Sequence, residues 1–214
     1  MKSMTLPAQR NRVALGLLAL VLALTFWAAV FATDAQAANV RLDGVRTTLT
    51  TDPATTTLLF SVGVIPLPIA PTPVVPTANA ARYSFPVTGG MVDAKTLVGK
   101  IRHSGGILLA KRNPDNSWTA LGLSEFTIRI DASPNLTANV TGVGRVSIAD
   151  LDLSKKVVKT YVRNGRAFVK ISNVGVTLNK TATDAIEATF FAGANALPDT
   201  VKLGTANVLA RVAH

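Results

Sequence analysis

From Tyr83 onward the chain consists of short runs of alternating apolar and polar residues, separated by clusters of Gly, Asn, Asp and Pro. In Phe126–Asp131 the apolar residues recur at every second position, which is the period of a strand with one buried face. Many short strands at this spacing are typical of a sandwich or a barrel. The sequence therefore predicts a mainly β fold, an antiparallel β-sandwich or barrel. Its predicted strands in this part are Tyr83–Val87, Leu97–His103, Ile107–Lys111, Trp118–Leu121, Phe126–Asp131, Leu136–Val140 and Val146–Leu153.

Two of these strands are followed by Gly-Gly pairs, which we predict to be turns that need positive φ. The pairs are Gly89-Gly90 and Gly105-Gly106. Trp118 and Phe126 are large aromatic residues within predicted strands, and we expect both to anchor the core.

Two short helices accompany the predicted strands. Asp52-Pro53 places an N-cap residue before a proline at the first helical position, which predicts a helix to about Ser61. Thr181 is the candidate N-cap of a second helix that reaches Phe191, with Gly193 after its end.

Further strands are predicted near both ends of the fold, at Val40–Thr51 and Val201–Val212. Ile65–Pro76 contains five prolines among apolar residues. Because proline donates no hydrogen bond to a β-ladder, this segment is predicted to be an edge strand or an extended connector.

The clearest predicted hairpin is Val157–Ile171, where Asn164-Gly165 lies between two alternating runs as a type I′ turn requires. One face of this hairpin then carries cations and rings: Lys159, Tyr161, Arg163, Arg166, Phe168 and Lys170. We call these six residues the basic face. The opposite face is expected to fill the core with Val158, Thr160, Val162, Ala167, Val169 and Ile171.

The N-terminus has the features of an export signal. Basic residues precede an apolar run, Val13–Ala32, which is followed by Ala35-Gln36-Ala37. This order predicts a signal peptide at residues 1–37, cleaved after Ala37. The apolar run is long enough to span a bilayer, so an uncleaved anchor is the alternative. Residues 38–214 are predicted to form a single β-rich domain that is secreted or associated with the cell envelope.

The chain has no cysteine and a net charge of +10, so an exported domain of this composition must be held by its core alone. A basic protein outside the cytoplasm is expected to meet an anionic envelope polymer or a membrane surface, and no nucleic acid. The basic face suits an anionic polymer, because cations supply charge and rings supply stacking. Protection of an edge hairpin against sheet addition is the alternative explanation.

The sequence contains no catalytic constellation, and it predicts that the protein is not an enzyme. No Gly-x-Ser-x-Gly segment occurs, and His103 is the only histidine within a predicted element. A metal site needs three or four ligands, and the residues around His103 supply none, so no metal is predicted. Asp150 and Asp152 share a strand face and are interpreted as solvated acids.

Several segments together resemble the HtaA-type domain of secreted and surface proteins of actinobacteria. The resemblance covers residues 82–212, and its segments are Tyr83–Gly90, Leu97–Gly106, Leu123–Asp131, Leu136–Val140 and Ile148–Leu153. That family is associated with haem uptake at the cell surface, on a mostly β fold. Its histidine in a His-x-Gly-type segment maps onto His103, and Tyr83 is a second candidate for contact with haem. The family's N-terminal Trp-Gly and Ser-Phe-x-x-Tyr motif is absent from this sequence.

The sequence thus predicts a non-catalytic secreted or cell-envelope binding module, with no cofactor and with a ligand that the residues do not identify. The alternative is a haem-binding protein of the HtaA type that uses His103, together with Tyr83.

Overall fold

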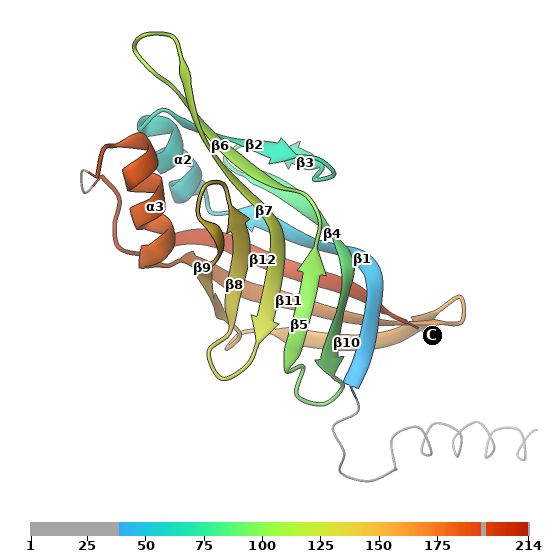
Figure 1. The fold of residues 1–214 in the computed structure, drawn as a ribbon. Helices are drawn as coiled ribbons and strands as arrows, with labels where there is room; N and C mark the ends of the chain where they lie inside the picture. Colours follow the sequence, from blue (N-terminus) through green and yellow to red (C-terminus); the bar gives the residue numbers. More distant parts are fainter. Residues whose placement is uncertain (1–38, 194–195, 214) are drawn as a thin grey trace, which may run out of the picture. The chain divides into compact units, whose positions relative to one another are not determined.

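Eight antiparallel strands close into a barrel in the computed structural model, which describes residues 39–193 and 196–213 (Figure 1). The ring closes because the last strand of the series, β8, pairs back with β7. In order around the ring, the strands are β7 (Trp118–Ile130), β5 (Gly99–His103), β4 (Ala81–Asp93), β1 (Asn39–Thr51), β12 (Val201–Val212), β11 (Arg166–Leu178), β9 (Gly144–Asp152) and β8 (Asn135–Val140). The predicted mainly β fold is confirmed, in its barrel form. The predicted signal peptide lies outside the described residues.

Four further strands extend the sheet beyond the ring. β6 (Gly106–Arg112) pairs with β7, and β2 (Val64–Ile69) pairs with β6 as the edge. β3 (Val74–Pro76) pairs with β4, and β10 (Val157–Arg163) pairs with β11. The proline-rich segment therefore forms edge strands, as predicted, because its prolines cannot donate to a second neighbour.

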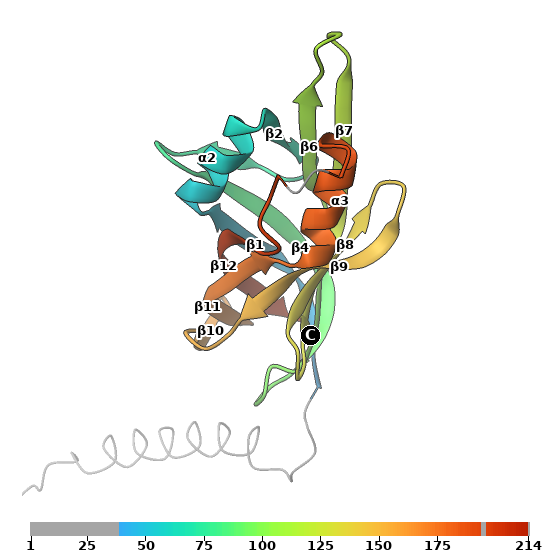
Figure 2. The same cartoon turned by 90° about the vertical axis from the view of Figure 1, so that its left-hand side faces the viewer.

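The two helices lie at the same end of the barrel (Figures 1 and 2). α2 (Pro53–Ser61) follows β1, and α3 (Lys180–Phe190) follows β11. Both strands pair antiparallel with β12, so they run in the same direction. The helices that follow them therefore lie at one end of the barrel. We call this the helix end of the barrel, and the other the far end.

Asp52 caps α2 as predicted, since its side chain accepts a hydrogen bond from the Ala54 N–H at 3.0 Å. The predicted cap of α3 is wrong. Asn179, in extended conformation, accepts from the Ala182 N–H at 3.1 Å, whereas Thr181 already lies in the first turn. Gly193 follows the helix with φ of +78°, as expected from its position.

Two long strands run through positions that the sequence suggested were turns. β4 continues through Gly89-Gly90 because a register shift between Val87 and Gly89 absorbs an extra residue. β7 likewise joins the two runs that were predicted as separate strands, with a register shift against β8. Of the four glycines, Gly89 and Gly105 have positive φ; Gly90 and Gly106 do not, and they lie in strands.

The hairpin register is confirmed, but its predicted core face is only partly correct: Ile171 is buried and Val169 packs partly buried against the core, whereas Val158, Thr160, Val162 and Ala167 are exposed. Arg163 pairs with Arg166 across a turn in which Asn164 and Gly165 both have positive φ. The side chains of Val158 and Val162 are nevertheless 39% and 56% exposed. β9 pairs with β11 only between Gly175 and Leu178, so the hairpin extends past β9, and every residue of β10 is exposed.

The core consists of buried aliphatic and aromatic side chains from the ring strands and α3, all within the described residues. Phe126 belongs to this core, as predicted, whereas Trp118 is 58% exposed near the β6–β7 turn, so its predicted anchoring role is wrong. The chain divides into two units, and the whole core lies in Ala38–His214. We therefore expect Ala38–His214 to fold without residues 1–37. Among the described residues, no helix has the length and apolar character needed to cross a membrane.

Candidate functional site

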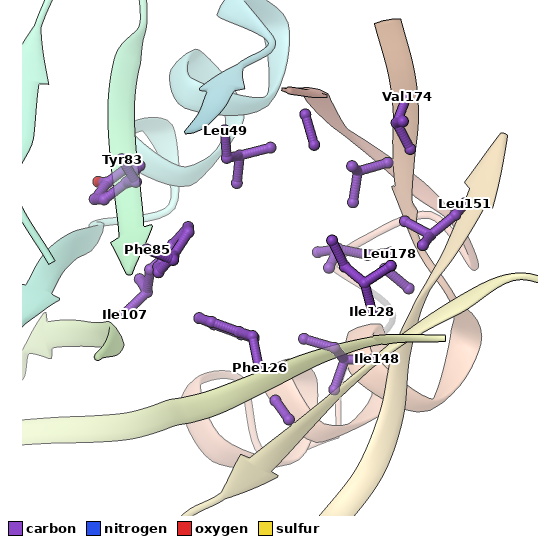
Figure 3. Close-up of a cluster of buried hydrophobic side chains, with 14 of the residues drawn as sticks. Leu49, Tyr83, Phe85, Ile107, Phe126, Ile128, Ile148, Leu151, Val174 and Leu178 are labelled. Carbon is purple, nitrogen blue, oxygen red and sulfur yellow. The ribbon is translucent and has the colours of Figure 1, made fainter. Parts of the chain in front are cut away.

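The barrel encloses a cavity of about 670 Å³ toward its helix end. Side chains from strands on all sides of the ring point into it, including Leu49, Phe85, Phe126, Ile148 and Leu178 (Figure 3). No Asp, Glu, Lys or Arg is among the described residues that line it. Its volume lies within the range of about 300–1,000 Å³ that is usual for ligand sites. The cavity is thus suited to a molecule whose buried part is apolar and uncharged.

The exposed lining residues come from two places, which define the mouth of the cavity. One is α2, where Thr57 and Phe60 are exposed, and the other is the turn after β3, at Thr77 and Asn79. The remaining lining residues lie deeper in the barrel. A ligand would therefore enter between α2 and this turn.

α2 buries only one of its residues, Thr55. The Thr55 hydroxyl donates to the Lys202 carbonyl, and the Lys202 ammonium lies 2.8 Å from the Asp52 carboxylate. The hydrogen bond from Lys202 lowers the pKa of Asp52 below its ordinary value. The helix beside the mouth is therefore held by polar contacts to the start of β12, together with Leu59, which packs partly buried against the core.

His103 lies at the end of β5, lines the cavity and is 4% exposed. Its Nδ1 is 3.1 Å from the Phe126 carbonyl oxygen, which can only accept, so Nδ1 carries the hydrogen. Nε2 then accepts from the Thr47 hydroxyl at 2.7 Å. Burial lowers the pKa of His103 to about 4, and the hydrogen bond to Phe126 offsets only part of this effect. His103 is consequently neutral at neutral pH.

This burial predicts a loss of stability in acid. The unfolded chain takes up a proton on His103 near its ordinary pKa of 6.5, whereas the folded chain does so only near pH 4. Stability therefore falls as pH falls between these values, by about 3 kcal/mol in total. Urea unfolding of wild type and His103→Gln at pH 7 and pH 4.5 measures this contribution. Equal losses in the two proteins would contradict the assignment of a buried neutral histidine.

Tyr83 lies on β4, beside the strand of His103, and lines the same cavity. It is 2% exposed, and its hydroxyl donates to the Pro66 carbonyl at 3.1 Å. Burial raises the pKa of Tyr83, so the phenol stays protonated. Its ring stacks on Phe85, which meets Phe126 edge to face with ring centroids 4.9 Å apart. The structure thus brings both sequence-predicted residues, His103 and Tyr83, to one apolar cavity.

Thr47 was missed by the sequence analysis. It is the hydrogen-bond partner of His103 and lies 56 residues away in sequence. As one of many threonines in a strand, it carries no local signal. α2 was predicted as a helix, but nothing in its sequence indicated that it borders a cavity.

The basic face lies outside the barrel, and none of its six residues lines the cavity. Tyr161 and Phe168 stack with ring centroids 5.4 Å apart. Asp150 and Asp152 are exposed, as interpreted from the sequence. Within residues 39–193 and 196–213, no three His, Cys, Asp or Glu side chains gather as a metal site would require.

This geometry defines the class of the protein, which is a closed antiparallel barrel with an apolar internal cavity. The chain is similar in fold to the C-terminal domain of HtaA from Corynebacterium glutamicum, with a TM-score of 0.51 and 16% identity over 79% of this chain and 99% of that domain. It is also similar to the heme binding protein HtaB from the same organism, with a TM-score of 0.48 and 14% identity over 81% and 95% of the two chains. No family model and no curated protein sequence matches. The HtaA-like fold expected from the sequence is confirmed.

Proposed function

We propose that this chain is a non-catalytic binding protein, acting outside the cytoplasm, that holds a large and mainly apolar molecule inside its barrel. The cavity carries this proposal, because about 670 Å³ of space lined by uncharged side chains is far more than a packed core leaves empty. Ligand sites typically combine apolar walls with a few placed polar groups. Here His103, Tyr83 and Thr47 are such groups. The predicted export signal supports the location.

Haem is the first ligand to test. The chain shares the fold of the HtaA domain, and its segments resemble the HtaA-type domain, which is associated with haem uptake. The apolar body of the porphyrin suits the uncharged walls, and its carboxylates suit the threonine-lined mouth, including Thr57 and Thr77. His103 and Tyr83 would be the residues that hold it. Bound haem would supply an iron atom, for which His and Tyr side chains can serve as ligands.

The cavity suits the iron atom of haem less well than it suits the porphyrin ring. Both nitrogens of His103 already have partners, and the Tyr83 hydroxyl is bonded to the Pro66 carbonyl. One of these hydrogen bonds would have to be given up before either side chain could contact iron. We therefore base the proposal on the cavity and treat iron coordination as a separate question.

A haem titration of Ala38–His214, followed in the Soret region, tests whether haem is the ligand. We expect a saturable spectral change with one haem per chain. If His103 contacts the iron, His103→Ala will change the bound spectrum and weaken binding about tenfold or more, since one ligand bond is lost. Tyr83→Phe tests the phenol in the same way. His214→Ala is the control, because it removes the other histidine of the chain.

An unchanged spectrum and affinity in His103→Ala would eliminate His103 as an iron ligand. No saturable change in the wild-type protein would eliminate haem. In either case, binding of an apolar probe that contains no metal tests the cavity proposal separately.

A further inference from the structure

The β10–β11 hairpin carries a concentration of positive charge that has no partner in the fold. Residues 155–171 contain no Asp or Glu. Six cations lie in this segment: Lys155, Lys156, Lys159, Arg163, Arg166 and Lys170. None of the six is in an ion pair among the described residues. The hairpin therefore presents cations that are available to an external anion.

The same hairpin also exposes apolar side chains. Every residue of β10 is exposed. The exposed fractions are 43% for Val157, 39% for Val158, 41% for Tyr161 and 56% for Val162. Apolar exposure that is concentrated on one element marks an interaction site. A partner of this hairpin should therefore accept both charge and apolar contact.

The positive charge and the exposed apolar side chains of the hairpin together distinguish an anionic polymer from an anionic bilayer as its partner. A soluble anionic polymer would pair with the basic face, but it would leave Val158 and Val162 on the opposite face in water. An anionic bilayer offers head groups for the cations and an acyl boundary for valine side chains. The observations therefore favour a membrane surface over a polymer.

The position of the hairpin in the fold agrees with this choice. β1 and β11 run in the same direction, so the start of β1 and the hairpin turn both lie at the far end of the barrel (Figure 1). The mouth of the cavity is at the helix end, so contact between the hairpin and a membrane would leave the mouth free.

We propose that the β10–β11 hairpin docks the barrel on a lipid bilayer that contains anionic lipid. Among the described strands β10 pairs only with β11, so the hairpin would enter the interface with its free β10 edge leading. The cations and Tyr161 of one face would then reach the head groups, while Val158 and Val162 of the other face contact the interfacial region. This inference is independent of what the cavity binds.

Co-sedimentation of Ala38–His214 with vesicles tests the proposal. We expect binding to vesicles of phosphatidylglycerol and phosphatidylcholine, no binding to phosphatidylcholine alone, and release at high salt. Arg163→Ala with Arg166→Ala should weaken binding about tenfold or more, because two head-group contacts are lost. Lys100→Ala with Arg102→Ala is the matched control, since both are exposed on β5, and it should bind like wild type.

A second pair of variants separates a bilayer from a polymer. Val158→Ser with Val162→Ser keeps every charge, so it should weaken vesicle binding and leave retention on a soluble polyanion, such as polyglutamate, unchanged. Equal vesicle binding by this pair and wild type would overturn membrane docking and favour an anionic polymer. Equal losses in the Arg163/Arg166 and Lys100/Arg102 pairs would overturn a specific role for the hairpin.

Discussion

Ala206→Phe is expected to weaken ligand binding about tenfold or more while the barrel stays folded. Ala206 is a buried residue of β12 that lines the cavity. A phenyl ring at this position would extend into open space instead of a packed core, so we expect the free energy of unfolding to stay within about 1 kcal/mol of wild type. The ring would occupy volume that the ligand needs. We expect the affinity for N-phenyl-1-naphthylamine, an uncharged fluorescent probe, to fall about tenfold or more.

Ala120→Phe is the matched control for this variant. Ala120 is exposed on β7 and does not line the cavity, so the same added ring should leave probe affinity unchanged. Equal probe affinity in wild type, Ala206→Phe and Ala120→Phe would show that the probe does not bind inside the barrel.

Gly204→Ala is expected to cost about 3 kcal/mol or more of stability. Gly204 has φ of +150°, a conformation that residues with a side chain rarely adopt, and this strain alone costs about 1–3 kcal/mol. A Cβ at this position would also lie 2.0 Å from the Thr50 carbonyl oxygen. That oxygen belongs to the backbone of β1, so the strand itself must move, at a further cost of about 1–3 kcal/mol. Urea unfolding measures the total loss.

Gly142→Ala measures the cost of backbone strain in the absence of a steric clash. Gly142 also has positive φ, at +78°, but a Cβ there would meet no heavy atom within 4 Å. Its cost should be only about 1 kcal/mol. Equal costs at the two positions would contradict the close approach of β1 and β12 that closes this side of the ring.

Local patterns predicted individual elements of this fold well. Alternation and Asn164-Gly165 identified the β10–β11 register, and Asp52-Pro53 identified the start of α2. These features depend on residues close together in sequence. The errors arose where distant contacts decide the outcome, as at Val158 and Trp118. Alternation shows that a strand has two faces, but it does not show whether another part of the chain covers either of them.

The candidate site was predicted only in part, for the same reason. His103 and Tyr83 were identified through a resemblance in their local segments, and both line the cavity. The cavity itself depends on the closure of the ring between β7 and β8, and its mouth on α2 lying near the turn at Thr77. No local pattern contains that information. The hydrogen bond from Thr47 to His103 likewise becomes visible only when β1 and β5 are placed in three dimensions.

Titration of wild-type Ala38–His214 with N-phenyl-1-naphthylamine tests the central claim most directly, because it measures the cavity without any requirement for iron. We predict a saturable rise in fluorescence with one probe per chain, and loss of that signal when a competing ligand such as haem occupies the same space. Absence of a saturable signal, with the protein shown to be folded by its unfolding transition, would contradict the proposal that the barrel is a ligand-binding site.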